Sequence, residues 1–91
     1  MTLLNQTQIE EALATLEGWE FEDDSIIKAF EFKDFDKAWD FMEKAAAAAK
    51  AADHHPEWTN VYDKVLIRLS THDAGGVTQQ DIDLAKTIEA I

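Results

Sequence analysis

Cysteine is absent from this chain of 91 residues, and proline and arginine occur only once each. A chain without cysteine forms no disulfide bond and offers no thiolate to a metal ion, which fits a reducing compartment. No apolar run approaches the roughly 18 residues of a membrane-spanning helix. The N-terminus also lacks a basic segment followed by an apolar one. We therefore expect a soluble protein of the cytoplasm.

Basic residues are scarce as well, with 8 lysines and arginines against 19 acids and a net charge of -11. Binding to DNA or RNA through phosphates needs a basic face, so we expect no direct nucleic-acid binding. The same deficit disfavours an anionic membrane surface and a polyphosphate substrate.

The length supports one domain, residues 1–91, with a single modest core. A hydrophobic fraction of 46% is typical of a globular protein and not of a disordered one. Chains of this size bury a limited share of their surface, so oligomerisation would be a natural way to cover more of it.

The first third of the chain predicts a helix and a β-hairpin. Thr7 and Glu10 form a capping-box pattern, so we expect a helix that begins at Thr7 and ends before Gly18. Residues 19–21 and 26–32 are rich in aromatic and β-branched side chains and flank three turn residues. They predict two short strands joined by a tight turn.

Asp34 is placed to cap a long helix over residues 35–52. Its apolar positions keep helical spacing: Phe35, Ala38, Trp39, Met42, Ala45, Ala46 and Ala49. The run of alanines predicts close packing against a sheet or another helix, because alanine has a small side chain and the best helix propensity.

Pro56 disfavours helical geometry at His55, so the long helix should stop near Asp53 and pass into a strand. Two strands, 58–62 and 65–71, would follow, with their turn at 63–64. Alternation places Val65, Ile67 and Leu69 on one face of the second strand. Leu66, Arg68, Ser70 and His72 fall on the other face.

The last helix should begin at the N-cap Thr78, with Asp81 in its first turn and a buried stripe of Leu84, Ile88 and Ile91. The predicted order is therefore α-β-β-α-β-β-α. Two hairpins in one antiparallel sheet, covered by helices on one face, would close the core and give an α+β fold.

The three histidines are the best candidates for chemistry, since imidazole both gives and takes a proton near neutral pH. His54 and His55 are adjacent, so a regular strand would point them to opposite sides. Each could instead be a surface residue or a cap for helix-terminal carbonyls. A metal site with Asp53, Glu57 or Asp73 is the second alternative, although no known ligand spacing is present.

A third alternative is metal-free acid–base catalysis by His54 and His72 at one pocket, with a planar substrate resting against Pro56. Asp81 fits the role of a first-turn acid that stabilises its own helix. Trp19 and Trp58 fit the core better than a substrate platform, and Tyr62 in a mid-strand position is expected to be structural.

One ordered set of residues resembles the pterin-4a-carbinolamine dehydratase family: His54-His55-Pro56, then Tyr62, His72 and Asp81. Further matches cover nearly the whole chain: Gly18-Trp19, Phe41-Met42, Thr71-His72-Asp73 with Gly76, and residues 81–85. The chain departs from the pattern at Lys50, where the best-known members carry an acid that helps to line the site. A lysine at this position could change the reaction rate or the pterin that the site prefers.

The resemblance implies four antiparallel strands with three helices on one face. It implies dehydration of 4a-hydroxytetrahydropterin to the quinonoid dihydropterin, without a metal or other cofactor. His54 and His72 would act as acid and base, and His55 would position the pterin. The remaining implied residues line or approach the pocket: Asp53, Pro56, Ser70, Thr71, Asp73, Asp81, Trp19 and Lys50.

The resemblance also implies a homodimer or homotetramer and a functional link to an aromatic amino acid hydroxylase. Two alternatives remain. Animal members of the family also bind a homeodomain transcription factor through helical faces, so the chain could be a dimerisation or regulatory module, with an exposed Phe41 marking the interface. A cation at Lys50 could instead meet the phosphate of a molybdopterin-type pterin.

Overall fold

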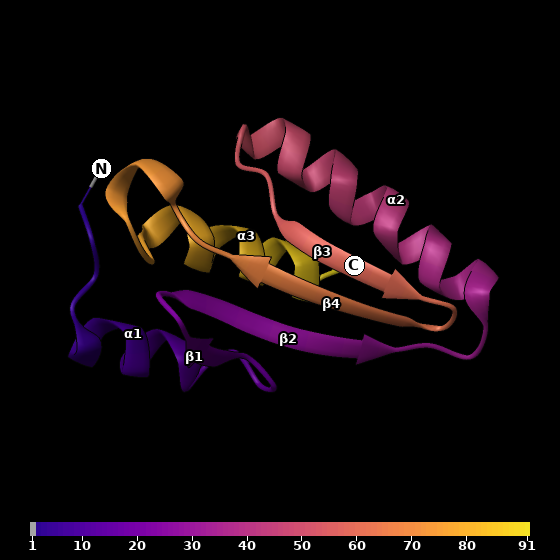
Figure 1. The fold of residues 1–91 in the computed structure, drawn as a ribbon, viewed down its shortest axis with the longest axis horizontal. Helices are drawn as coiled ribbons and strands as arrows, with labels where there is room; N and C mark the ends of the chain where they lie inside the picture. The colour runs from indigo at the N-terminus through magenta and orange to yellow at the C-terminus, as the bar shows by residue number, and fades with distance from the viewer. Residues whose placement is uncertain (1) are drawn as a thin grey trace.

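The computed structural model describes residues 2–91, which form a four-stranded sheet with three helices (Figure 1). The order is the predicted α-β-β-α-β-β-α, with a short 3₁₀ turn before the last helix. The elements are α1 (Gln6–Leu13), β1 (Glu20–Glu22), β2 (Ser25–Glu31), α2 (Phe35–Ala52), β3 (Glu57–Val61), β4 (Lys64–Leu69), η1 (His72–Ala74) and α3 (Gln79–Glu89).

The sheet is antiparallel throughout, and its strands lie in the order β1-β2-β4-β3. Each hairpin therefore contributes one central and one edge strand, and the pairing of β2 with β4 joins the two hairpins. The predicted alternation in β4 is confirmed. Val65, Ile67 and Leu69 are at most 1% exposed on the inner face, whereas Leu66 is 40% exposed on the opposite face.

The helices cover the inner face and share its core. Small side chains of α2, namely Ala38, Ala45 and Ala49, are at most 3% exposed, so this helix lies close to its neighbours. From α3, Ile82, Leu84, Ala85 and Ile88 enter the same core. The predicted stripe of this helix is wrong at Ile91, which follows the end of α3 and is 45% exposed.

The start of α1 differs from the prediction. Asn5, not Thr7, is the N-cap: its side chain accepts a hydrogen bond from the Gln8 amide, and the Gln8 side chain accepts one from the Asn5 amide, both at 2.8 Å. Asparagine is at least as good an N-cap as threonine, so the earlier of two overlapping capping-box patterns forms. The helix ends at Leu13, and turns continue to Gly18, which has the expected positive φ of 87°.

The prediction for α2 is confirmed at both ends, with Asp34 accepting a hydrogen bond from the Lys37 amide at 2.9 Å. Its outer surface differs from expectation. Phe41 is only 8% exposed and packs against Phe30 and Phe32, with ring centroids 4.7 and 4.9 Å away. Phe35 and Trp39, expected on the apolar stripe, are 41% and 48% exposed and stack on each other.

The turn between β3 and β4 lies one residue earlier than predicted. Tyr62 occupies the turn with a positive φ of 54° and is 65% exposed, so it is not a mid-strand residue. The side chain of Asn60 donates to the carbonyls of Tyr62 and Lys64 at 3.2 and 2.9 Å, which holds the turn closed. Within residues 2–91, none of the helices combines the length and apolar character that crossing a membrane requires.

Candidate active site

The histidine segment lies where α2 passes into β3. Asp53 ends α2 in the left-handed conformation, with φ 51° and ψ 42°, and the His54 amide reaches back to the Ala49 carbonyl at 3.0 Å. The Asp53 amide also donates to the Lys50 carbonyl at 3.2 Å. Both hydrogen bonds satisfy carbonyls that the last helical turn leaves without partners. Pro56 then keeps the chain extended into β3, which begins at Glu57. The predicted exit is confirmed.

His54 points to the helix side of this exit, where its Nε2 lies 2.5 Å from Oδ1 of Asp81. The Asp81 side chain is fully buried, and 11% of the His54 side chain is exposed. A fixed carboxylate at Nε2 favours a proton on that nitrogen and sets the orientation of the ring. His54 also lines a hollow of about 250 Å³ with residues of α3.

Asp81 connects His54 to the segment that carries His72. Its Oδ2 accepts hydrogen bonds from Oγ1 of Thr71 and from the amide of Thr78, each at 2.8 Å. The Thr78 contact is half of the capping box of α3. The helix-capping interpretation of Asp81 is therefore confirmed, and the residue also belongs to a buried network between the two histidine segments. It is not part of the lining of the hollow beside His54 or of the polar cavity on the open side of the sheet.

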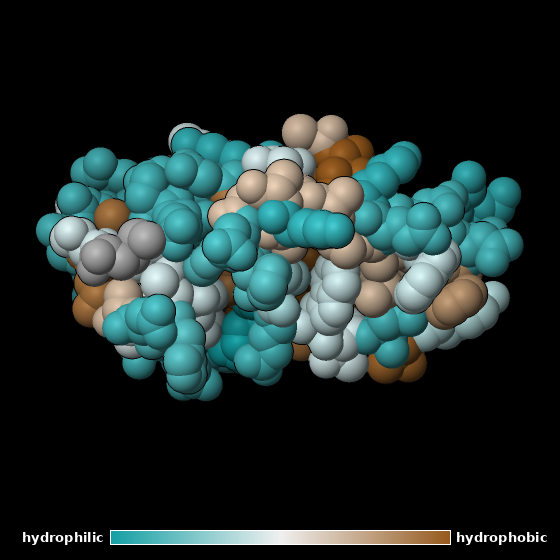
Figure 2. Space-filling view, turned by 90° about the horizontal axis from the view of Figure 1, so that it is seen from above, coloured by the Kyte–Doolittle hydropathy of each residue, from teal (hydrophilic) through white to brown (hydrophobic). Residues whose placement is uncertain are grey.

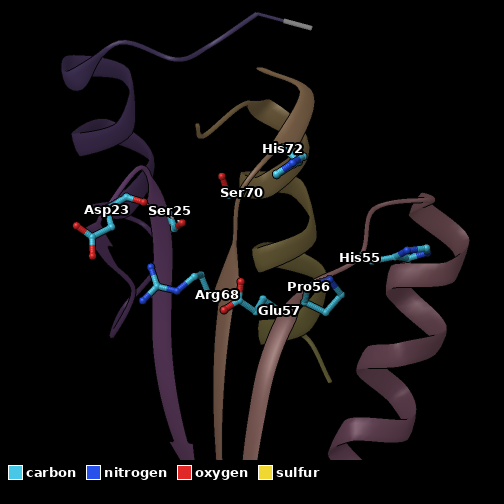
Figure 3. Close-up of a pocket in the computed structure, with 8 residues that line it drawn as sticks. All are labelled: Asp23, Ser25, His55, Pro56, Glu57, Arg68, Ser70 and His72. Atoms are coloured by element: carbon cyan, nitrogen blue, oxygen red, sulfur yellow. Dashed lines mark hydrogen bonds between the residues drawn. The ribbon is translucent and has the colours of Figure 1, made fainter. Parts of the chain in front are cut away.

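A second, polar cavity of about 440 Å³ opens on the uncovered side of the sheet (Figure 3). Side chains from three neighbouring strands and their ends line it: Asp23, Ser25, His55, Pro56, Glu57, Arg68, Ser70 and His72. In Figure 3, Arg68 extends from β4 toward Asp23 and Ser25, whereas His55 lies at the rim with its ring directed toward the end of α2. His55 and His72 thus share a cavity that does not include His54.

The structure gathers most of the predicted site residues into these two adjoining parts. His55, Pro56, Ser70 and His72 line the cavity, while His54, Thr71 and Asp81 form the buried network. Thr71 directly precedes His72 and is 7% exposed. The network therefore fixes the residue at which the turn carrying His72 begins.

Four predicted residues lie elsewhere. Trp19 is 4% exposed in the core, and its indole N–H donates to Glu89 at 2.7 Å, so it packs beneath α3 and does not reach the cavity. Lys50 is exposed in the last turn of α2, and Asp53 is occupied in ending that helix. Asp73 is exposed in η1 and is not part of the cavity lining.

Sequence reasoning missed three residues of the cavity, Asp23, Ser25 and Arg68, and named Glu57 only as an alternative metal ligand. The alternation in β4 already placed Arg68 on the same face as Ser70 and His72, which was a usable signal. The contribution of Asp23 and Ser25 depends on the pairing of β2 with β4, a contact between segments distant in sequence. No local pattern carries that information.

The described part of the site does not have the side-chain arrangement of a metal centre. Among residues 2–91, no three histidine, aspartate or glutamate side chains converge closely enough to hold a metal ion. The groups that the site offers for chemistry are therefore imidazoles, carboxylates, hydroxyls and one guanidinium.

The fold and the site define a small α+β protein with a histidine-lined polar cavity beside an open sheet. Comparison with known proteins identifies the family to which this chain belongs. The family model for pterin 4 alpha carbinolamine dehydratase matches residues 2–91. The chain therefore belongs to the pterin-4a-carbinolamine dehydratase family, a family of lyases.

Individual relatives agree over nearly their full lengths. A protein of Opitutus terrae, named as a candidate pterin-4-alpha-carbinolamine dehydratase, is 50% identical over 91 residues, which cover 99% of this chain and 94% of the relative. A relative of the same name from Prochlorococcus marinus is 47% identical and covers 98% and 93%. The crystal structure of a transcriptional coactivator/pterin dehydratase from Brucella melitensis matches with a TM-score of 0.95, at 43% identity and coverages of 98% and 97%.

Proposed function

We propose that this chain dehydrates 4a-hydroxytetrahydrobiopterin, a pterin-4a-carbinolamine, to quinonoid dihydrobiopterin and water by histidine acid–base catalysis. One imidazolium would protonate the 4a-hydroxyl, which leaves as water with the electrons of its bond to carbon. A neutral imidazole would take the proton from a ring nitrogen, whose electrons form the new double bond. The reaction needs no oxidant or reductant.

The observation that carries the proposal is the linked arrangement of the three histidines. His72 and His55 line one cavity, and a buried carboxylate fixes His54 beside it. We assign the acid and base roles to His54 and His72, and the positioning role to His55. An alternative pair, His55 with His72, is favoured by their shared cavity.

Single variants separate these assignments. We expect His54→Gln and His72→Gln each to lower kcat by about 10²- to 10⁴-fold, the usual contribution of a positioned acid or base. His55→Gln should mainly raise KM. The assay follows disappearance of chemically generated carbinolamine by ultraviolet absorbance, with circular dichroism to confirm folding. Equal rates for wild type and all three variants would exclude the proposed histidine catalysis. A large loss of kcat in His55→Gln, without a comparable loss in His54→Gln, would select the alternative pair of His55 and His72.

The same proposal includes a place in tetrahydrobiopterin recycling. The substrate has a hydroxyl on a ring carbon of a reduced pterin, so an oxygen-inserting enzyme must form it, and an aromatic amino acid hydroxylase fits that class. The cavity holds two carboxylates but only one permanently charged base, Arg68. That balance suits an uncharged pterin better than a phosphorylated one, and Lys50, the cation that suggested a molybdopterin-type ligand, lies outside the lining.

A second candidate function is an interaction module acting through α2. The residue that was expected to mark its interface, Phe41, is buried, but Phe35 and Trp39 are exposed on the same helix. Figure 2, seen from above Figure 1, shows a weakly hydrophobic surface bordered by hydrophilic side chains. We propose a homodimer or homotetramer that uses this surface. Light scattering at high protein concentration tests it, and a monomer under those conditions would count against it.

A further inference from the structure

The open face of the sheet carries three charged side chains beside the histidines. Glu57 on β3 stands directly opposite Arg68 on β4, and Asp23 lies in the turn that starts β2. Figure 3 shows the guanidinium of Arg68 reaching toward Asp23, with Glu57 on its other side. Residues opposite each other in antiparallel strands have Cβ atoms about 5 Å apart, so one ligand could touch both Glu57 and Arg68.

Most of the hydrogen-bonding capacity of these side chains is unused. Within residues 2–91, Arg68 donates only to Glu22, to its carbonyl at 3.3 Å and to its Oε2 at 3.4 Å. Both contacts are long for N–H···O hydrogen bonds, and a guanidinium has five N–H groups. The carboxylates of Glu57 and Asp23 accept no hydrogen bond from the described part of the chain. The cavity therefore presents free donors next to free acceptors.

The charge balance indicates which ligand would use them. Two carboxylates line the cavity against one guanidinium and two imidazoles, so the cavity offers an anionic ligand no excess of fixed positive charge. A neutral planar ring with two N–H groups beside a carbonyl fits better. One carboxylate can accept two parallel N–H bonds, and the neighbouring guanidinium can donate to the carbonyl. The 2-amino-4-oxo-pyrimidine edge of a pterin has this pattern of donor, donor and acceptor.

We propose that Glu57 and Arg68 determine pterin specificity, with Glu57 accepting from the 2-amino group and N3–H and Arg68 donating to the 4-oxo group. The inference rests on the proposed function and adds the residues that recognise the substrate. Neither residue moves a proton in this assignment. Pro56, between Glu57 and His55 in sequence, keeps the recognition residue and the histidine segment in a fixed relation.

Two ligands that differ at one group test the assignment. Pterin and lumazine share N3–H and the 4-oxo group, but lumazine has a 2-oxo group where pterin has the 2-amino group. Wild type should bind pterin about 10- to 100-fold more tightly, the effect of one hydrogen bond to a charged group. Glu57→Gln should narrow or reverse this preference, because its amide can donate to a 2-oxo group. Arg68→Met should weaken both ligands to a similar degree.

Matched controls are available on the same open face. Glu31→Gln and Lys64→Met make the same charge changes on β2 and β4 but outside this cavity, and they should bind both ligands as wild type does. Fluorescence titration gives the affinities, circular dichroism confirms folding, and the carbinolamine assay runs in parallel. If wild type dehydrates the carbinolamine while Glu57→Gln keeps the full preference for pterin, the specificity assignment is wrong and the proposed function stands. If wild type binds neither ligand and shows no dehydration, both fail.

Discussion

Replacing Asp81 by asparagine removes one charge from the centre of the buried network without changing the size of the side chain. The carboxylate is fully buried and accepts hydrogen bonds from His54, Thr71 and the Thr78 amide. An asparagine has only one accepting oxygen. The amide of Thr78 cannot accept, so the arrangement that costs least keeps the oxygen at Thr71 and Thr78 and turns the NH₂ group toward His54.

Two effects follow from that arrangement. The loss of a hydrogen bond to a charged acceptor should lower the free energy of unfolding by about 1.5 to 3 kcal/mol. For a domain of this size, the Tm should then fall by roughly 6 to 24 °C. In addition, Nε2 of His54 must now accept a hydrogen bond, so its proton moves to Nδ1. If His54 acts as acid or base, this tautomer lowers kcat by up to about 10²- to 10⁴-fold.

Thermal unfolding by circular dichroism and the carbinolamine assay, run well below the Tm of the variant, measure the two effects separately. Asp83→Asn is the matched control: it lies on α3 two residues away, is exposed and accepts one hydrogen bond from the Gln79 side chain. Its stability should stay within about 0.5 kcal/mol of wild type. An Asp81→Asn variant that is folded, as stable as wild type and fully active would refute the role given to the network.

Two further predictions concern the elements that support the site. Phe41→Ala should lower the free energy of unfolding by about 3 to 5 kcal/mol because it removes a buried ring, measured by urea denaturation; a loss as small as that of the exposed Trp39→Ala would contradict the packing described for α2. Asp53→Gly should raise stability by up to about 1 kcal/mol, since glycine adopts a φ of 51° without strain and an acid at a helix C-terminus is unfavourable. A lower Tm for Asp53→Gly in thermal unfolding would show that the aspartate side chain contributes a contact of its own.

Local chemistry explains which parts of the fold could be predicted. Asp34 and Pro56 act on the residues beside them, so both ends of α2 followed from the sequence. The start of α1 did not, because Asn5 and Thr7 each begin a capping-box pattern and only the competition in the folded chain decides between them. The β3–β4 turn was shifted because Tyr62 adopts a positive φ that its residue type does not favour.

The site, like the fold, has some residues that local sequence predicts and others that depend on contacts between distant segments. His55, Pro56 and His72 stand out as scarce residues at predicted element ends, and they do line the cavity. Arg68 was placed on the correct face by alternation, but its proximity to Asp23 depends on the pairing of β2 with β4. Trp19 packs in the core, as its residue type favoured, and not near the pocket, where the family resemblance had placed it. Residue patterns thus identified the histidines, while strand order determined their neighbours.

The position of Asp81 couples folding to the chemistry proposed for the site. The carboxylate that completes the capping box of α3 is also the group that orients His54 and accepts from Thr71 next to His72. Since α3 packs on α2, the helix that ends at the histidine segment, any motion that separates the two helices would also break the His54 contact. The imidazole of His54 should therefore be oriented before a substrate arrives. That preorganisation favours acid–base chemistry over a purely structural role for the network, because a helix cap alone needs no partner from the segment that follows α2.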